Sequence, residues 1–171
     1  PETGYRHKEG RLSTVTTYGS HQAQGAVLVV DDEAPIGQLL QQWLADEGYR
    51  TRYASNFEAA RAALTQDSYD LVTLDIMMPD VSGLEILPWL REHHPDTGVI
   101  MATALGELNT GLEAMRLGAV NYLLKPFNME LVSEEVARAM ECQRLIAENR
   151  SYQQELEQKV EEQTRQIRLA H

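Results

Sequence analysis

Between Ala26 and Lys125 the chain alternates five times between short apolar segments and longer segments of helical periodicity, and this alternation constrains its fold most strongly. Five segments have the length and composition of strands: 26–30, 49–55, 71–75, 98–103 and 119–125. Helical spacing occurs in the segments between them: 36–44 within DDEAPIGQLLQQWLADEG, then 57–67, 82–95 and 107–118. Strands that alternate with helices through short loops form βα units and a parallel sheet covered on both faces. The sequence therefore predicts an α/β fold with a doubly wound, five-stranded parallel sheet.

Local signals set several helix boundaries. Gly48 follows the first helical segment where a helix C-terminus favours glycine, and Asn56 can cap the segment 57–67. Pro88 lies inside the third helical segment and is expected to kink or shorten it.

Three regions differ in pattern along the chain. Residues 1–25 show little apolar periodicity and several turn-forming residues, so we expect a tail or linker. Residues 26–128 contain the five βα repeats and form the predicted domain core. From Met129 a helical pattern without glycine or proline continues nearly to His171, so residues 129–171 are expected to extend the last helix.

The composition excludes several classes of protein. The formal net charge of −11 argues against a chain that binds nucleic acid or an anionic membrane surface electrostatically. No segment has the length and hydropathy of a membrane span or a signal peptide. The single cysteine, Cys142, excludes an intramolecular disulfide framework and is expected to be a small buried or interfacial residue. We therefore expect a cytoplasmic protein that contacts neither nucleic acid nor membrane directly.

Polar residues gather where the expected strands end. In a doubly wound sheet, functional groups collect outside the carboxyl ends of the strands. Five residues fall there: Asp31, Asp32, Asp75, Thr103 and Lys125. Crowded carboxylates repel one another unless a proton, a basic partner or a hard cation offsets their charge. An oxygen-only set of ligands favours Mg²⁺.

A carboxylate beside Mg²⁺ can also attack a phosphoryl group, because the metal and a nearby ammonium offset the charge on the transferring oxygens. Lys125 and Thr103 are suitable partners, since one supplies a point charge and the other a hydrogen-bond donor. A purely structural alternative is that the Asp31–Asp32 pair caps the first helix, Asp75 caps a turn and Lys125 forms a salt bridge with them.

Four sequence motifs resemble those of the receiver domain of bacterial two-component response regulators. They are VLVVDDE (27–33), LVTLDIMMPDVSGLEIL (71–87), MATA (101–104) and AVNYLLKPF (119–127). They occur in the order and spacing of that family, and the resemblance covers about residues 26 to 140. It implies the flavodoxin-like form of the predicted sheet, with the βα unit repeated five times.

The resemblance also implies roles for individual residues. Asp75 would be the phosphorylated residue, and Asp31, Asp32 and Asp75 would bind Mg²⁺ together with the backbone carbonyl of Met77. Phosphorylation would require a histidine kinase or a phosphotransfer protein as partner.

The remaining implied roles concern the response to phosphorylation. Thr103 would hydrogen-bond the phosphoryl group, Lys125 would pair with it, and Tyr122 would be the aromatic switch that swings inward as Thr103 moves. The Lys125–Pro126 peptide bond would be cis.

The helical segment 129–171 keeps a heptad spacing for six repeats. Position a would hold Val132, Ala139, Ile146, Gln153, Val160 and Ile167, and position d would hold Glu135, Cys142, Asn149, Leu156, Gln163 and Ala170. This seam is only partly apolar, which favours a weak, adjustable coiled coil and a homodimer. The alternative is a solvated helix that merely extends the domain.

The segment LEQKVEEQTRQIRLAH (156–171) is similar in composition to signalling helices that join receivers to output domains. Such outputs include HD-GYP phosphodiesterases, diguanylate cyclases, PP2C-type phosphatases and kinase modules. We expect a receiver that relays its phosphorylation state through a dimerising helix and is not an enzyme beyond its own phosphoryl transfer and dephosphorylation.

Two other functions remain open. A Mg²⁺-dependent phosphohydrolase would use Asp75 as a turnover nucleophile, but it would need a second carboxylate where Met77 stands. A pseudo-receiver would only dimerise, and an incomplete set of acidic, lysine and threonine residues would favour it. Met77 and Leu105 are apolar at positions that flank the route of a hydrolytic water, which predicts slow loss of the phosphoryl group.

Overall fold

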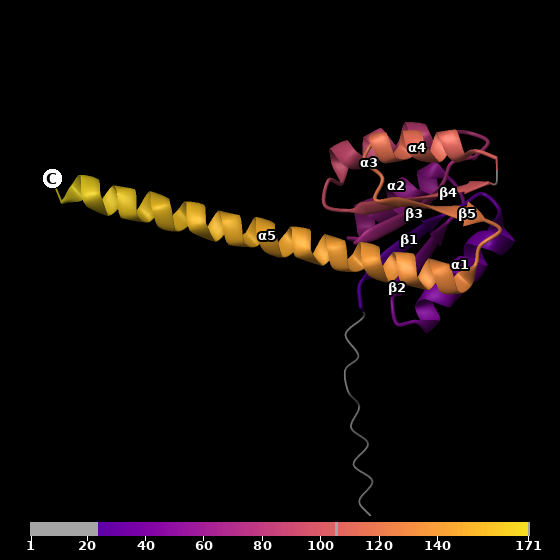
Figure 1. Ribbon diagram of the computed structural model, residues 1–171, viewed down its shortest axis with the longest axis horizontal. Helices are drawn as coiled ribbons and strands as arrows, with labels where there is room; N and C mark the ends of the chain where they lie inside the picture. Colours follow the sequence, from indigo (N-terminus) through magenta and orange to yellow (C-terminus); the bar gives the residue numbers. More distant parts are fainter. Residues whose placement is uncertain (1–23, 105, 171) are drawn as a thin grey trace, which may run out of the picture.

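The computed structural model describes residues 24–104 and 106–170 and contains a five-stranded parallel sheet between two layers of helices (Figure 1). The strands are β1 (Ala26–Val30), β2 (Arg50–Ala54), β3 (Leu71–Asp75), β4 (Gly98–Ala104) and β5 (Asn121–Lys125). The helices are α1 (Ala34–Asp46), α2 (Phe57–Gln66), α3 (Gly83–His93), α4 (Leu108–Arg116) and α5 (Met129–Leu169). The strand order β2-β1-β3-β4-β5 confirms the predicted doubly wound sheet.

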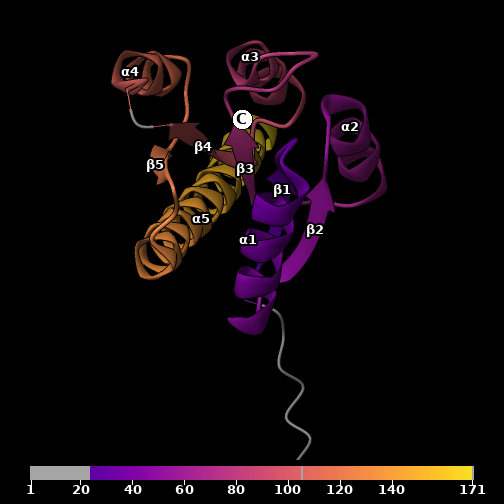
Figure 2. The same cartoon turned by 90° about the vertical axis from the view of Figure 1, so that its right-hand side faces the viewer.

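Alternation of side chains along each strand divides the core into two halves. Val27 and Val29 of β1 pack with α1 and α5, whereas Leu28 and Val30 pack with α2, α3 and α4. Figure 2 shows these two helical layers on opposite faces of the sheet. Because β1 and β3 are covered on both faces, all their residues are buried, as their apolar sequences predict.

Most local signals act as expected. The side chain of Asn56 accepts a hydrogen bond from the Ala59 N–H at 2.8 Å and so caps α2. Gly48 follows α1 with φ of 101°, a conformation that glycine adopts without strain. The expected shortening of α3 at Pro88 is wrong, because the helix continues through this residue to His93. Proline removes only one hydrogen bond, and the buried face of α3 compensates for it.

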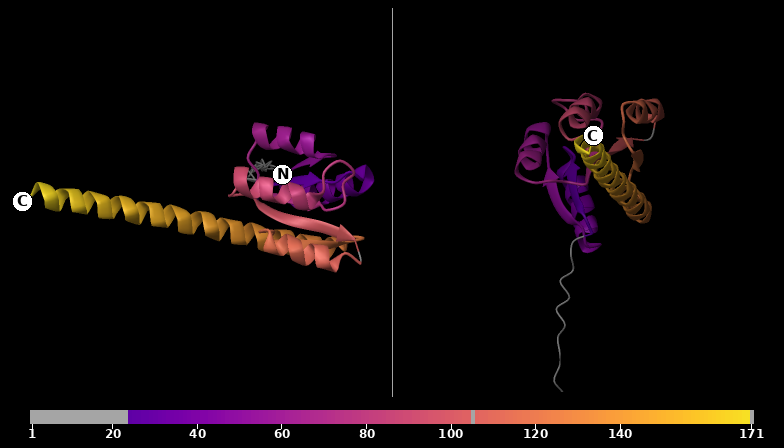
Figure 3. Two further views of the ribbon diagram at one scale, coloured as in Figure 1. Left: turned by 90° about the horizontal axis from the view of Figure 1, so that it is seen from above. Right: turned by 90° about the vertical axis from the view of Figure 1, so that its left-hand side faces the viewer.

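Helix α5 begins on the sheet and leaves it (Figures 1 and 3). Val132, Val136 and Ala139 are buried on the face of the sheet that α1 also covers. In contrast, every residue from Arg144 to Ala170 is exposed. Cys142 is exposed in the single chain, so it is not buried in the core of its own domain, and the alternative of an interfacial position stays a prediction. Among the residues that the structure describes, no helix is long and apolar enough to cross a membrane.

Polar contacts fix the direction in which α5 leaves the domain. The Gln143 side chain donates to the carbonyl of Asp96 at 2.9 Å, and Arg150 forms an ion pair with the Asp96 carboxylate. Both contacts are made to the loop between α3 and β4, at the amino-terminal edge of the sheet. The expected tail at residues 1–25 lies outside the described residues, apart from Gln24 and Gly25.

Candidate phosphoryl-acceptor site

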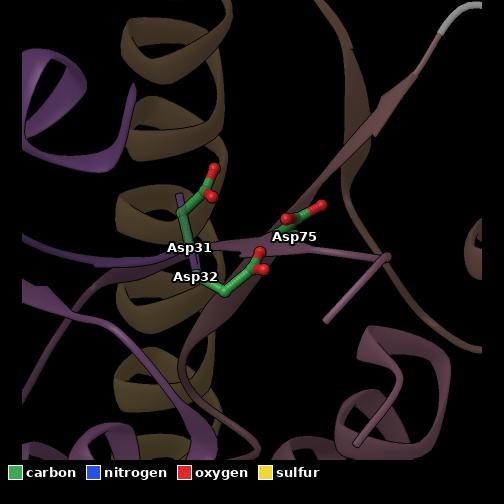
Figure 4. Close-up of side chains that lie close together, drawn as sticks. All are labelled: Asp31, Asp32 and Asp75. Carbon is green, nitrogen blue, oxygen red and sulfur yellow. The ribbon is translucent and has the colours of Figure 1, made fainter. Parts of the chain in front are cut away.

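Three carboxylates meet at the carboxyl ends of the two central strands. Asp31 directly follows β1, Asp32 is the next residue, and Asp75 ends β3. One oxygen from each carboxylate lies within 4.8 Å of the others, and Figure 4 shows the three side chains side by side. Asp31 and Asp75 are buried and Asp32 is exposed, so the cluster is open to solvent on one side only. The structure thus brings together the three acidic residues predicted from the sequence.

The Lys125 ammonium lies among these carboxylates. Its Nζ atom is 2.8 Å from Asp31 Oδ2, 3.3 Å from Asp75 Oδ2 and 3.2 Å from Glu33 Oε1. Burial alone would lower the pKa of Lys125, but its hydrogen bond to Asp31 and the charges of Asp75 and Asp31 raise the pKa above its usual value. Lys125 therefore stays positively charged in the site.

The cluster carries more negative charge than Lys125 offsets. The pKa of Asp75 is raised from 3.8 to about 7, chiefly by burial, with the charge of Asp31 and a hydrogen bond with Asp32 acting in the same direction and Lys125 opposing them. A bound divalent cation would favour the ionised carboxylates. The donors are all oxygen atoms, which suits a hard cation such as Mg²⁺.

The structural alternative explains only part of this arrangement. The Met77 N–H donates to Asp75 Oδ1 at 3.2 Å, so Asp75 does stabilise the turn after β3. However, α1 begins after Glu33, and no side chain in the described part of the chain caps its first turn. The Asp31–Asp32 pair is thus not the cap of this helix, and capping does not account for the three converging carboxylates.

Thr103 and Tyr122 lie on neighbouring strands beyond the acidic cluster. Thr103 is fully buried, and its hydroxyl can donate its one hydrogen either to Glu107 Oε2 at 3.4 Å or to the Ala104 carbonyl at 3.5 Å. The hydroxyl is thus directed to the β4–α4 connection and is not bonded to Asp75. The Tyr122 ring is partly buried and packs against Gly111 of α4, where an added Cβ would be 3.5 Å from Cγ of the ring.

The other predicted features are only partly visible. The Met77 side chain is 63% exposed beside the site, and the Lys125–Pro126 bond is cis, as the resemblance implies. Leu105 lies outside the described residues.

The sequence alone did not indicate Tyr53, whose hydroxyl donates to the Asp31 carbonyl at 2.6 Å. Its only signal was an aromatic residue near the carboxyl end of the edge strand.

Comparison with known proteins agrees with this geometry. Residues 27–137 match the model of the response regulator receiver domain family. The response regulator protein PilR of Pseudomonas aeruginosa is 38% identical over 121 residues, which cover 71% of this chain and 27% of PilR. The nitrogen assimilation regulatory protein NtrX of Azorhizobium caulinodans is 35% identical over 130 residues, which cover 75% of this chain and 29% of NtrX.

Solved structures show the same similarity. The receiver domain of NtrX from Brucella abortus superimposes with a TM-score of 0.65 at 36% identity, covering 67% of this chain and 98% of that domain. A longer NtrX structure from the same organism, in complex with ATP, gives a TM-score of 0.71 at 35% identity and is covered over only 29% of its length. The chain therefore spans less than a third of the length of PilR and of these longer NtrX proteins.

Proposed function

Because the chain belongs to the response regulator receiver domain family, we propose that its Asp75 accepts a phosphoryl group from a phosphohistidine. Receiver domains are signalling modules that histidine kinases or phosphotransfer proteins phosphorylate. The observation that carries the assignment is the position of Asp75, which is 3% exposed at the end of β3 and lies 3.3 Å from Lys125 Nζ. Asp31 is equally buried and lies 2.8 Å from the same ammonium, and Asp75 is distinguished from it by its position in the receiver motif LVTLDIMMPD.

Charge balance supports a role for Mg²⁺. Receiver domains bind Mg²⁺ at an acidic pocket, and the cluster of Asp31, Asp32 and Asp75 fits such an ion. In our proposal these carboxylates and the Met77 carbonyl hold the metal, which offsets negative charge on the transferring phosphoryl oxygens. Lys125 supplies the second positive charge, and its contact with Asp75 directs that charge to the acceptor.

The proposed switch consists of Thr103 and Tyr122. The two alternative hydrogen bonds of the Thr103 hydroxyl, at 3.4 and 3.5 Å, are long, so little energy opposes its turning toward a phosphoryl group on Asp75. Movement of Thr103 would free space beside β4, into which the partly buried Tyr122 ring could turn from its place against α4. Both residues are proposed as switch residues on this basis.

We also propose that α5 pairs with α5 of a second copy in a parallel coiled coil. An isolated polar helix has little to stabilise it, yet α5 continues with exposed residues only from Arg144 to its end at Leu169. Its exposed apolar residues include four positions of the heptad seam: Ile146, Leu156, Val160 and Ile167. The proposed domain division thus keeps residues 26–128 as the core and 129–171 as the extended last helix.

The structure limits the part of α5 that is available for pairing with a second copy. Val132 and Ala139, the first two residues at position a, are buried in the core of their own domain, and Glu135 accepts a hydrogen bond from Asn121. These positions are therefore unavailable to a partner. A straight helix turns a heptad stripe by about 20° per repeat, so the seam at Val160 faces roughly 80° away from the buried face at Val132. The proposed coiled coil starts near Ile146, where the seam has turned clear of the domain.

The proposed output lies beyond the described residues. The full-length relatives are regulators more than three times as long as the matching segment. On this basis we propose that α5 relays the state of Asp75 to an output domain of a class such as an HD-GYP phosphodiesterase, diguanylate cyclase, PP2C-type phosphatase or kinase module.

Intact-mass analysis tests the proposed acceptor. Incubation with acetyl phosphate and Mg²⁺ should add one phosphoryl group that hydroxylamine removes, and chelation of Mg²⁺ should prevent its addition. The Asp75→Asn variant should gain none, whereas Asp80→Asn, which changes an exposed carboxylate in the same loop, should be labelled like the wild type. Equal labelling of the Asp75→Asn variant would rule out Asp75 as the acceptor.

A further inference from the structure

The backbone of Asp31 leaves the sheet immediately before the acidic cluster, and a side chain from another strand holds it there. The last hydrogen bond of the β1–β2 ladder runs from the Asp31 N–H to the Ala54 carbonyl, at 3.1 Å. The Asp31 carbonyl extends past this ladder, and the hydroxyl of Tyr53 donates to it at 2.6 Å. Tyr53 lies on β2 opposite Val29 and reaches the loop that carries both Asp31 and Asp32.

The hydrogen bond from Tyr53 adds to two other contacts that hold Asp31 in place. The Glu33 N–H donates to Asp31 Oδ1 at 2.9 Å, and the Lys125 ammonium is 2.8 Å from Asp31 Oδ2. Asp31 is 2% exposed, so loss of the Tyr53 hydroxyl would leave a buried carbonyl without this donor. The loop could then satisfy the carbonyl only by turning it toward water, which would rotate the neighbouring carboxylates.

Helix α1 leaves space for the Tyr53 ring only because residue 37 is glycine. A methyl group at Gly37 would be 2.3 Å from Tyr53 Cε2 and 3.2 Å from Asp31 Cβ. Since real contacts of Cβ atoms are longer than this, any larger residue would displace the ring. Gly37 and Tyr53 therefore form a matched pair behind the β1–α1 loop.

We propose that Tyr53, seated against Gly37, is a positioning residue that holds the Asp31–Asp32 loop in the conformation that binds Mg²⁺. This inference rests on the proposed function, because it concerns the same metal site. Tyr53 itself does not touch the metal or the phosphoryl group. Its effect is on the affinity for Mg²⁺, through the backbone of Asp31.

Calorimetric titration with Mg²⁺ tests the inference. Removal of the hydroxyl in Tyr53→Phe should weaken Mg²⁺ binding about fivefold, the change that corresponds to one hydrogen bond of ordinary strength. The matched control is Tyr69→Phe, because the Tyr69 hydroxyl is also buried but has no hydrogen-bond partner among the residues that the structure describes. This control should bind Mg²⁺ like the wild type.

A second readout separates positioning from a general loss of structure. Phosphorylation of Tyr53→Phe by acetyl phosphate should be slow at low Mg²⁺ and should recover to the wild-type rate when Mg²⁺ is raised well above the dissociation constant of the variant. A variant that is merely less folded would show no such recovery. Equal Mg²⁺ affinity of the wild type and a folded Tyr53→Phe would overturn the inference and leave the proposed function intact.

Gly37→Ala provides an independent test that does not remove the hydroxyl. Displacement of the ring should weaken Mg²⁺ binding in the same direction, and this effect should disappear in a Tyr53→Leu background, where the ring is absent. Unchanged affinity in Gly37→Ala would contradict the inference even if Tyr53→Phe failed to fold. Failure of the wild type to bind Mg²⁺ at all would overturn the proposed metal site together with this inference.

Discussion

At the scale of single residues, the site is governed by an excess of buried negative charge around Asp75. Lys125 touches Asp31 and Asp75 but does not offset both of them together with Asp32. Burial, with a smaller contribution from the charge of Asp31, raises the pKa of Asp75 to about 7 despite Lys125, so its carboxyl group holds a proton over much of the acidic range. The excess negative charge of these carboxylates lowers the unfolding free energy of the metal-free protein. The same charge would favour binding of a cation.

This pKa predicts how stability depends on pH. From about pH 4 to about pH 7, the folded protein binds more protons at Asp75 than the unfolded chain, so the contribution of this carboxyl to the unfolding free energy falls as pH rises through that window. In Asp75→Asn this contribution is absent. With a chelator present, we expect the variant to be more stable than the wild type at pH 8 and the difference to shrink toward pH 4.

Urea denaturation at a series of pH values measures this difference, with Asp80→Asn as the control for an exposed carboxylate. Addition of Mg²⁺ at pH 8 should stabilise the wild type and should have little effect on Asp75→Asn. A difference between wild type and variant that grows toward low pH would contradict the direction of the Asp75 shift.

The exposed Met77 side chain predicts a long lifetime for the phosphorylated protein. It lies beside Asp75 and has no group that could orient an attacking water. Met77→Asn should therefore hydrolyse its acyl phosphate several-fold faster, with a further gain on adding Leu105→Glu. Decay is followed by intact mass after removal of the phosphodonor. Met77→Leu, which also lacks such a group, should decay like the wild type, and an unchanged rate in the Asn variant would exclude gating by this side chain.

At the scale of elements, the sequence predicted most of the sheet because each strand is an uninterrupted or alternating apolar run between turn-forming residues. The strand-end residues Asp31, Asp75 and Lys125 could likewise be assigned, since parallel strands deliver their last residues to one edge. Contacts between side chains distant in sequence could not be predicted. The bond from Tyr53 to Asp31 and the space over Gly37 depend on how α1 packs against β2.

The heptad pattern shows the same limit. Its spacing is continuous from Val132 to Ala170, but nothing in the spacing indicates that Val132 and Ala139 are buried in their own domain. Likewise, Pro88 predicted a kinked or shortened helix, but α3 continues through it, because the buried face of α3 stabilises the helix and the sequence does not show that packing. Periodicity identifies a face of a helix without identifying the surface that covers it.

The free part of the seam leads to a prediction for α5. Val160→Glu combined with Ile167→Glu would bury charges between the paired helices, and we expect the dimer dissociation constant to rise about 100-fold or more. Sedimentation equilibrium measures this change, and phosphorylation of Asp75 should be unaffected. The control carries Gln158→Glu and Arg165→Glu, which lie outside the seam. A wild-type chain that stays monomeric at high concentration would leave only a solvated helix.

At the scale of the whole molecule, α5 connects the two edges of the sheet. Asn128, which caps the first turn of α5, is three residues from Lys125 in the acidic site. The helix then crosses the face of the sheet that α1 covers and leaves the domain (Figure 3). It leaves at the amino-terminal edge of the sheet, where Gln143 and Arg150 contact Asp96. In the proposed relay, a change at Lys125 would reach one continuous helix of 41 residues, which spans about 60 Å.

The central claim is that the state of Asp75 changes how two α5 helices pair. Cys142 is the single cysteine, is exposed, and precedes the free part of the seam, so a spin label on it reports the separation of the two helices where they diverge. Electron–electron dipolar spectroscopy should give an intermolecular distance that shifts when beryllofluoride is added with Mg²⁺ and stays constant in Asp75→Asn. An identical distance distribution in the wild type with and without beryllofluoride, or no dipolar coupling in either state, would contradict the claim.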